Sequence, residues 1–202
     1  GVWETPDLFQ LPVDDGSELR WVLTVGVGNG SVAGGSGTQY FIGDFDGKTF
    51  TSINPKETIL WMDYGADFYA PQSWNDEPHG RRIMLGWMSN WQYARNVPTP
   101  SWRGAMTLPR ELKLIKLPSG EIVLNGYPTS EFENYGSKWN DLQSQAQKFA
   151  GGSPASFSLG NADAFDYSVE LDLSAANRVT IQLANSKNKV FDVILDKARQ
   201  QV

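Results

Sequence analysis

The sequence predicts an all-β fold, on two observations. Short runs of β-branched and aromatic residues, separated by turn-forming residues, recur from residue 8 to about residue 117 and again in 167–195. In 39–50, alternating aromatic residues flank an Asp46-Gly47 turn whose glycine accepts a positive φ, which is typical of a β-hairpin. Antiparallel sheets follow from this pattern. Four-stranded propeller blades, a barrel and a sandwich would all share it, so the choice among the three stays open.

Residues 1–127 are predicted to form one all-β region. Each expected strand is a short run with apolar and aromatic residues, bounded by turn-forming residues. These strands are expected at Leu19–Val27, 38–45, 49–53, 83–88 and 111–116. The glycine-rich segments 26–30 and 34–37 are not followed by a helical pattern, so they are predicted to be loops rather than phosphate-binding turns.

The second half of the chain has a different composition. Residues 128–152 are rich in Ser, Gln, Asn and Lys and are predicted to be a linker, with one short helix at 142–149. Residues 153–202 are predicted to be an incomplete β-sandwich, because so few strands cannot close a sandwich of typical size. Its strands are expected at 167–173, 179–183 and 190–195. The first residues lack an initiator Met and a signal region, so the chain is expected to be a piece of a longer protein.

Composition excludes several classes of function. The 202 residues carry a net charge of -6 and no block of Lys or Arg, which argues against a nucleic-acid partner. No apolar run approaches the ~20 residues of a membrane helix, so no membrane association is expected. The chain has no cysteine, and no cluster has metal-ligand spacing, so neither a metal nor a cofactor is expected. Eight Trp, 7 Tyr and 10 Phe suit sugar binding, although tryptophan-rich cores exist as well.

Residues 3–9 place two carboxylates, Glu4 and Asp7, beside Trp3, with Pro6 holding the chain extended. Packing against an aromatic ring would shield Glu4 from water and disfavour its charged form, as a general acid near neutral pH requires. Glycosidases use such a group. An exposed acidic turn would produce the same local sequence, so both interpretations stay open here.

Two aromatic motifs follow. In 61–70, an extended chain would direct Asp67 and Tyr69 to one face and Phe68 into a core, although an ordinary surface turn is the alternative. In 86–91, Trp87 and Trp91 would share a face of a strand unless a turn at 89–90 breaks the register. One of these two is predicted to be a core residue and the other a platform for a sugar.

Two further signals are predicted to be structural. The arginines and the glutamate of 102–112 are expected to form ion pairs near strand ends. The one histidine, His79, lies in a predicted turn, and no second histidine is present for a catalytic pair.

Five motifs in this order resemble the β-fructofuranosidase family, which includes levanases, inulinases and invertases. They are residues 3–9, 34–45, 63–70, 86–91 and 103–112. Bacterial levanases look most similar among the subgroups. The resemblance implies a five-bladed β-propeller followed by a β-sandwich, so this chain would contain part of each. It also implies a secreted protein and a fructan or sucrose-type carbohydrate substrate.

The resemblance implies roles for individual residues. Glu4 would be the general acid/base of a retaining hydrolysis. Tyr69 and Trp91 would line the fructose subsite, with Asp67 and Asp7 as neighbours. Thr5 stands where the family usually has cysteine, and its hydroxyl would change the hydrogen bonding around Glu4.

Two family motifs are absent from the 202 residues. The nucleophilic aspartate belongs to a Trp-Met-Asn-Asp-Pro-Asn-Gly motif, and a second aspartate that stabilises the transition state belongs to an Arg-Asp-Pro motif. The chain is therefore expected to supply an acid/base without a nucleophile and to be inactive alone. Two alternatives stay open: a non-catalytic fructan-binding module or degenerate paralogue, and a different propeller glycosidase such as an arabinanase-like enzyme.

Overall fold

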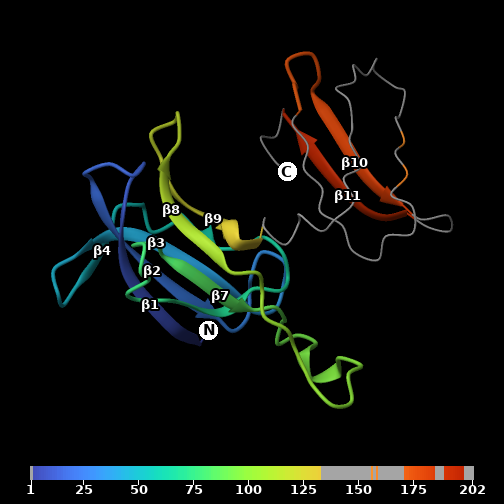
Figure 1. Cartoon of the computed structure of the whole chain (residues 1–202), viewed down its shortest axis with the longest axis horizontal. Coiled ribbons are helices and arrows are strands. Elements are labelled where there is room, and N and C mark those ends of the chain that lie inside the picture. The colour runs from blue at the N-terminus through green and yellow to red at the C-terminus, as the bar shows by residue number, and fades with distance from the viewer. Residues whose placement is uncertain (1, 133–155, 157, 159–170, 185–188, 198–202) are drawn as a thin grey trace. The chain divides into compact units, whose positions relative to one another are not determined.

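The computed structural model describes residues 2–132, 156, 158, 171–184 and 189–197 (Figure 1). The chain divides into two compact units, 1–135 and 136–202. Almost all regular structure in the described residues is antiparallel β-sheet, which confirms the predicted all-β class. None of the described helices is long and apolar enough to cross a membrane.

The first sheet of unit 1 is an antiparallel meander, four strand positions wide. Its strands are β1 (Trp3–Pro12), β2 (Leu19–Val27), β3 (Gly37–Phe45), β4 (Phe50–Ser52) and β5 (Leu60–Trp61). The short β4 and β5 both pair with β3, one at each half of that strand, and so share the fourth position. The predicted hairpin is confirmed: Asp46 Oδ1 accepts hydrogen bonds from the N–H groups of Lys48 and Thr49, and Gly47 has φ +93°.

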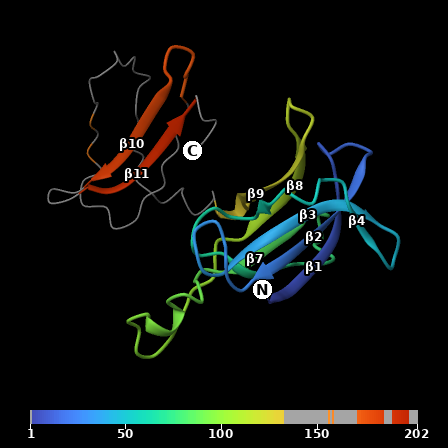
Figure 2. The ribbon, with the colours of Figure 1, turned by 180° about the vertical axis from the view of Figure 1, so that it is seen from behind.

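The second sheet of unit 1 is also a four-stranded antiparallel meander in sequence order. Its strands are β6 (Tyr69–Ser73), β7 (Ile83–Trp87), β8 (Arg110–Lys116) and β9 (Ile122–Pro128). The long connection from β7 to β8 holds the 3₁₀ turn η1 (Ala94–Asn96) and extends away from the sheets in both ribbon views (Figures 1 and 2). Two such meanders have the form of propeller blades. The number of blades stays a prediction.

Apolar side chains at every second position of the strands form the core of unit 1, because alternate residues of a strand face the same side. Both sheets contribute to it, with Val22, Ile42 and Met84 wholly buried. The buried cluster consists of Phe9, Leu11, Val13, Val22, Tyr40, Ile42, Phe68, Met84, Leu112 and Leu114. The parallel bridge between Val13 and Leu114 adds a backbone contact between β8 and the residue that follows β1. The two sheets are therefore held together by a shared core.

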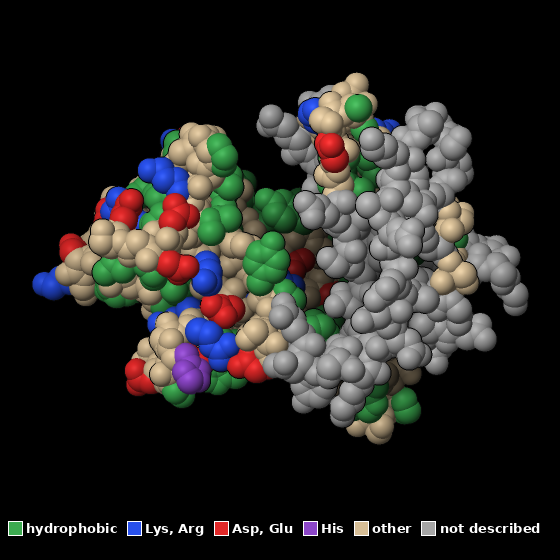
Figure 3. All heavy atoms as spheres, turned by 45° about the horizontal axis from the view of Figure 1, so that its top comes forward, with side chains coloured by type: hydrophobic (Ala, Val, Ile, Leu, Met, Phe, Trp, Pro, Cys, Tyr) green, Lys and Arg blue, Asp and Glu red, His purple; other side chains and the backbone are tan. Residues whose placement is uncertain are grey.

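Charged side chains in unit 1 pair across its loops. Arg110 forms an ion pair with Asp63 at 2.7 Å and lies over the Phe68 ring. Arg81 donates hydrogen bonds to Glu77 and to Glu131, which lies in the turn that follows β9. Figure 3 shows acidic and basic side chains side by side next to the one histidine (purple). Arg110 is thus in a structural ion pair as predicted for its motif, although its partner lies outside that motif.

The described part of unit 2 contains one hairpin, β10 (Arg178–Ala184) and β11 (Lys189–Asp196). These strands match the predictions at 179–183 and 190–195. The predicted linker helix at 142–149 lies outside the described residues, as does most of the predicted strand at 167–173, whose last three residues are not in a strand. Pro128, where the predicted linker begins, is the last residue of β9. The division into 1–127, 128–152 and 153–202 stays a prediction.

Candidate active site

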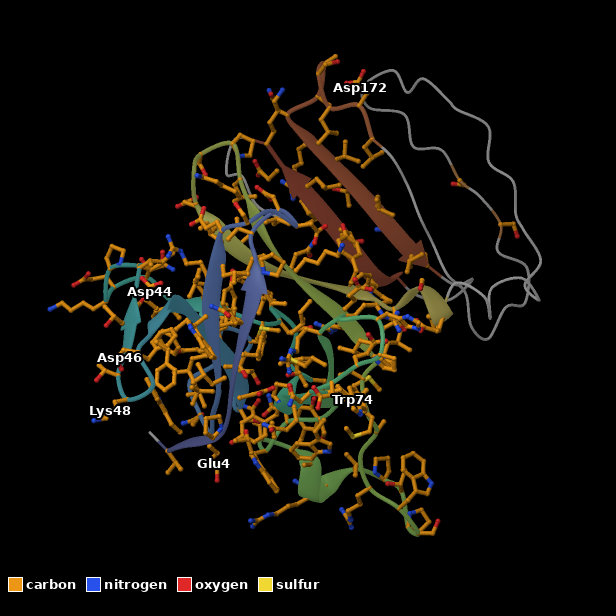
Figure 4. All side chains as sticks on the ribbon, turned by 60° about the vertical axis from the view of Figure 1, so that its left-hand side comes forward. Glu4, Asp44, Asp46, Lys48, Trp74 and Asp172 are labelled. Atoms are coloured by element: carbon orange, nitrogen blue, oxygen red, sulfur yellow. The ribbon has the colours of Figure 1, made fainter. Side chains whose placement is uncertain are left out.

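Glu4 lies near the start of β1, directly before a β-bulge. The pairing of β1 with β2 shifts between Glu4 and Asp7, so Thr5 and Pro6 form the irregular step. Thr5 has φ +47°, a left-handed conformation that a β-branched residue rarely adopts. Bulges bend a strand and change the direction of the neighbouring side chains. The Glu4 side chain is exposed and points away from the sheets at the edge of the unit (Figure 4).

Tyr69 is the first residue of β6 and, like Glu4 in β1, lies directly before a β-bulge. The pairing of β6 with β7 shifts between Tyr69 and Gln72, and Ala70, the residue after the tyrosine, has φ +48°. The Tyr69 side chain is buried, and its hydroxyl donates a hydrogen bond to Glu4 Oε2. Burial, followed by the hydrogen bond and the charge of Glu4, raises the pKa of Tyr69 to about 12. The phenol therefore keeps its proton at neutral pH and acts as a donor to the carboxylate.

Further polar contacts join the two bulged strands. Gln72 Nε2 donates to the Thr5 carbonyl at 3.2 Å. Asp7 Oδ2 accepts from the Ser73 N–H at 2.8 Å and from the Ser73 hydroxyl at 2.5 Å. These bonds fix β1 against β6 on the C-terminal side of the contact between Glu4 and Tyr69.

A glycine on β2 makes room for this contact. A Cβ atom on Gly26 would lie 3.0 Å from Thr5 Oγ1 and 3.2 Å from Tyr69 Cε2. Contacts this short require the neighbours to move, so only glycine lets the Tyr69 ring and the Thr5 bulge approach β2 as closely as they do.

Aromatic rings continue from Tyr69 along the second sheet. The ring centroids of Tyr69 and Trp87 are 6.3 Å apart, and those of Trp87 and Trp91 are 5.0 Å apart. Trp91 is 50% exposed. A shallow hollow of about 300 Å³ is lined by Trp87, Trp91, Ala94, Arg95 and Arg103. Indole faces and arginine donors suit the apolar faces and the hydroxyls of a sugar. Among the described residues, no group of three or more His, Asp or Glu side chains is placed to hold a metal ion.

The structure brings some of the predicted site residues together and separates others. Glu4 and Tyr69 are in direct contact. Trp91 is connected to Tyr69 only indirectly, because the ring of Trp87 lies between them and packs against both. Asp7 instead binds Ser73, as described above. Asp67 is exposed and accepts a hydrogen bond from the Tyr93 hydroxyl.

The structure corrects the predicted shielding of Glu4 by Trp3. Neighbouring residues of a strand point to opposite faces, and Trp3 is 60% exposed, with its ring 5.8 Å from that of Phe41. The aromatic residue in contact with Glu4 is Tyr69, from another strand. Glu4 itself is exposed, which is the alternative that the local sequence left open.

Two other expectations also differ from the structure. The strand begins only at Tyr69, so Asp67 and Tyr69 do not share an exposed face, although Phe68 is buried as predicted. A turn after β7 does break the register between Trp87 and Trp91, and neither ring belongs to the buried core cluster. The two tryptophans instead pack against each other beside the hollow.

Sequence reasoning missed the polar residues that hold the site together. Gln72, Ser73 and Asn90 belong to or follow recognised motifs, but nothing in their residue types distinguishes them from solvated side chains. Asn90 is fully buried, and Gln72 binds the Thr5 carbonyl. Both roles depend on segments that are distant in the sequence. The one local signal is the Asn in the turn at 89–90, which indicates side-chain bonding to nearby backbone.

Comparison with known proteins identifies the family. The model of the glycosyl hydrolases family 32 N-terminal domain matches residues 1–125. The chain belongs to this family. A levanase of Bacillus subtilis (strain 168) is 48% identical over 183 residues, which cover 86% of this chain and 26% of the levanase. An extracellular exo-inulinase of Aspergillus niger is 38% identical over 214 aligned positions, which cover 100% of this chain and 39% of that enzyme.

Solved structures of two related enzymes are also similar to this chain. The crystal structure of an exo-inulinase from Aspergillus awamori matches with a TM-score of 0.61 and 42% identity, covering 66% of this chain and 27% of that one. A fructofuranosidase from Schwanniomyces occidentalis, solved in complex with fructose, matches with a TM-score of 0.58 and 36% identity. That match covers 62% of this chain and 25% of the fructofuranosidase. The chain therefore spans only part of the length of these relatives.

Proposed function

We propose that this chain supplies the general acid/base, Glu4, of a retaining hydrolase that cleaves β-fructofuranosyl bonds in fructans. The observation that carries the proposal is the contact of the Glu4 carboxylate with the buried Tyr69 phenol, at the start of an aromatic row that leads to an open hollow. The 48% identity to a levanase supports levan as the substrate. The matched Aspergillus exo-inulinases are named extracellular, which supports a secreted protein.

The chemistry follows from the placement of these groups. In the first step Glu4 donates its proton to the departing sugar oxygen, and in the second it accepts a proton from the attacking water. Tyr69 donates to one oxygen of Glu4 and so fixes the plane of the carboxyl group. Trp91, with an exposed indole face beside the hollow, would contact the fructosyl unit.

A retaining reaction also needs a nucleophilic carboxylate about 5–5.5 Å from the acid/base. The four aspartates of the matched motifs have other partners: Asp7 binds Ser73, Asp67 binds Tyr93, Asp44 is paired with Arg20, and Asp63 is paired with Arg110. None of them belongs to a motif that resembles the nucleophile segment of the family. We therefore place the nucleophile in the parent protein outside these 202 residues, and expect the chain by itself not to release fructose.

The test is the Glu4→Gln substitution in the full-length parent protein. Loss of a general acid/base lowers kcat by about 100- to 10,000-fold on levan. The loss should be smaller on a fructofuranoside with a nitrophenol leaving group, because nitrophenolate departs without protonation. Glu57→Gln, an exposed site on the loop between β4 and β5, is the matched control and should retain full activity. Near-normal turnover of levan by the Glu4→Gln protein would remove Glu4 from the mechanism.

The exposed indole beside the hollow also favours a second candidate, a non-catalytic fructan-binding module. In that case levan binds in a manner that depends on Trp91, yet the full-length protein shows no turnover. Equilibrium binding of levan and assay of fructose release, made on the same full-length preparation, separate the two functions. Turnover that Glu4→Gln abolishes would exclude the module.

A further inference from the structure

A buried amide joins three loops beside the aromatic row. The Asn90 side chain is 0% exposed. The two N–H groups of its Nδ2 donate to the carbonyls of Gly34, Ser36 and Ala66, at 3.0, 3.1 and 2.8 Å, so that one of them is shared between two carbonyls. Its Oδ1 accepts from the N–H groups of Ser36 at 3.1 Å and Gln92 at 2.9 Å. These partners come from the loop before β3, the loop before β6 and the turn after β7.

The chemistry of this junction requires an amide. A carboxylate at position 90 has the same shape but no donor, so it would face three carbonyl oxygens inside the protein. The neighbouring backbone also closes over the side chain: a Cβ on Gly35 would lie 2.0 Å from Asn90 Oδ1, and Gly35 has φ +64°. Glycine meets both conditions because it lacks Cβ and adopts positive φ without strain.

The same junction holds the backbone of Trp91. The Trp91 N–H donates to the buried hydroxyl of Ser36 at 3.0 Å. The Asn90 carbonyl accepts from the N–H groups of Tyr93 and Ala94, which bends the chain into the turn that leads to η1. The main chain on either side of Trp91 is thus fixed by buried groups, while half of its side chain stays accessible.

We propose that Asn90 and Ser36 are positioning residues that fix the Trp91 indole against the fructosyl unit of the substrate. The inference rests on the proposed function, because it takes Trp91 to be a sugar contact. Neither residue touches the substrate. Asn90 holds the loop that contains Ser36, and the Ser36 hydroxyl then holds the Trp91 backbone, so the three loops set the indole in place before substrate binds.

Ser36→Ala in the full-length parent protein tests the proposal. The substitution keeps the N–H and carbonyl of residue 36 that Asn90 binds, and removes only the hydroxyl that Trp91 uses. Loss of one hydrogen bond corresponds to a rise in KM for levan of about 3- to 10-fold, with kcat changed by less than about 2-fold. Ser119→Ala removes a hydroxyl from the exposed β8–β9 turn, where it donates to Glu121, and should leave KM unchanged.

A double-substitution cycle separates positioning from mere stability. Trp91→Ala is expected to raise KM at least as much as Ser36→Ala, and the double variant should match Trp91→Ala alone, because Ser36 acts only through the indole. Additive effects, or an unchanged KM in Ser36→Ala, would overturn the inference while the role of Trp91 stands. An unchanged KM in Trp91→Ala would overturn the proposed sugar contact, and the inference with it. Glu4→Gln reports on the catalyst independently of both.

Asn90→Asp provides a second measurement at the junction. We expect a larger rise in KM than in Ser36→Ala together with a lower Tm, because a buried carboxylate faces carbonyl oxygens. A folded Asn90→Asp protein with unchanged KM would contradict the proposal. Since this variant also threatens folding, Ser36→Ala remains the deciding one.

Discussion

At the scale of single residues, the hydrogen bond from the Tyr69 hydroxyl orients the Glu4 carboxylate. The phenol is buried whereas the carboxylate is exposed, so one partner is fixed by packing and the other is available to a substrate. Because the pKa of Tyr69 is raised to about 12, by burial first and by Glu4 second, the donor does not ionise anywhere near neutral pH. Glu4 therefore meets a constant hydrogen-bond donor throughout the neutral pH range.

Tyr69→Phe removes that hydroxyl and keeps the ring. A hydrogen bond to a charged group contributes about 1.5–3 kcal/mol, so we expect kcat of the full-length protein to fall by about 10- to 100-fold. KM should change much less, because the ring still packs against Trp87. Steady-state kinetics on levan measure both constants. An unchanged kcat would show that Glu4 does not need the phenol.

At the scale of elements, β1 and β6 repeat one construction. Each has a predicted site residue, then a residue with positive φ, then a shift in strand pairing. The contacts of Gln72 with Thr5 and of Ser73 with Asp7 then lock the two strands together. Glu4 and Tyr69 are thus brought into contact because each lies directly before the bulge of its strand and the two strands are held together beyond the bulges.

Asp7→Asn should weaken this connection between the strands. Both hydrogen bonds from Ser73 reach one carboxylate oxygen, Oδ2, and the neutral amide oxygen that would replace it is a weaker acceptor than a charged one. We expect a loss of about 1–2 kcal/mol in the free energy of unfolding. Urea denaturation followed by tryptophan fluorescence measures it, since seven of the eight tryptophans lie in residues 1–135. Asp15→Asn, which loses only an exposed pairing with Lys113, is the control; equal losses in both variants would contradict the role of Asp7.

Local pattern predicted some elements well and others not at all. The strand at Leu19–Val27 has the predicted bounds, because its apolar residues alternate between turn-forming neighbours. Strands β1 and β6 were not predicted as strands, because each contains a proline and a bulge that interrupt the alternation. The contact of Glu4 with Tyr69 and the contacts of Asn90 join segments that are distant in the sequence. They depend on long-range packing, which periodicity does not contain.

At the scale of the whole of unit 1, Arg81 joins the start of β7 to the turn after β9. Its hydrogen bonds hold the pKa of Glu131 at about 2, well below the usual 4.5, and also lower the pKa of Glu77. Both carboxylates are therefore more acidic in the folded state than in the unfolded state. Their contribution to stability is fully present above the ordinary pKa and is lost as the pH falls toward 2.

Glu131→Gln removes one arm of this network. We expect the Tm of the variant to lie below that of the unaltered protein at pH 6, and the difference to shrink as the pH falls from about 4.5 toward 2. Thermal melts across that range, with Glu57→Gln as the control, measure the difference. A difference in Tm that stays constant down to pH 2 would show that the pairing with Arg81 does not stabilise the fold.

The placement of Glu4 and Tyr69 on separate sheets has a consequence for engineering. The distance between them depends on the register of two strands and on the packing between two sheets, so a deletion of one residue in either bulge would rotate Glu4 or Tyr69 to the opposite face. The long excursion between β7 and β8 is subject to no such pairing over most of its length. Within that connection Asn90, Trp91 and the residues that line the hollow should stay in place, so libraries that vary chain length should be directed to residues 97–101. Libraries that vary the two bulges should keep the residue number fixed and change only side chains.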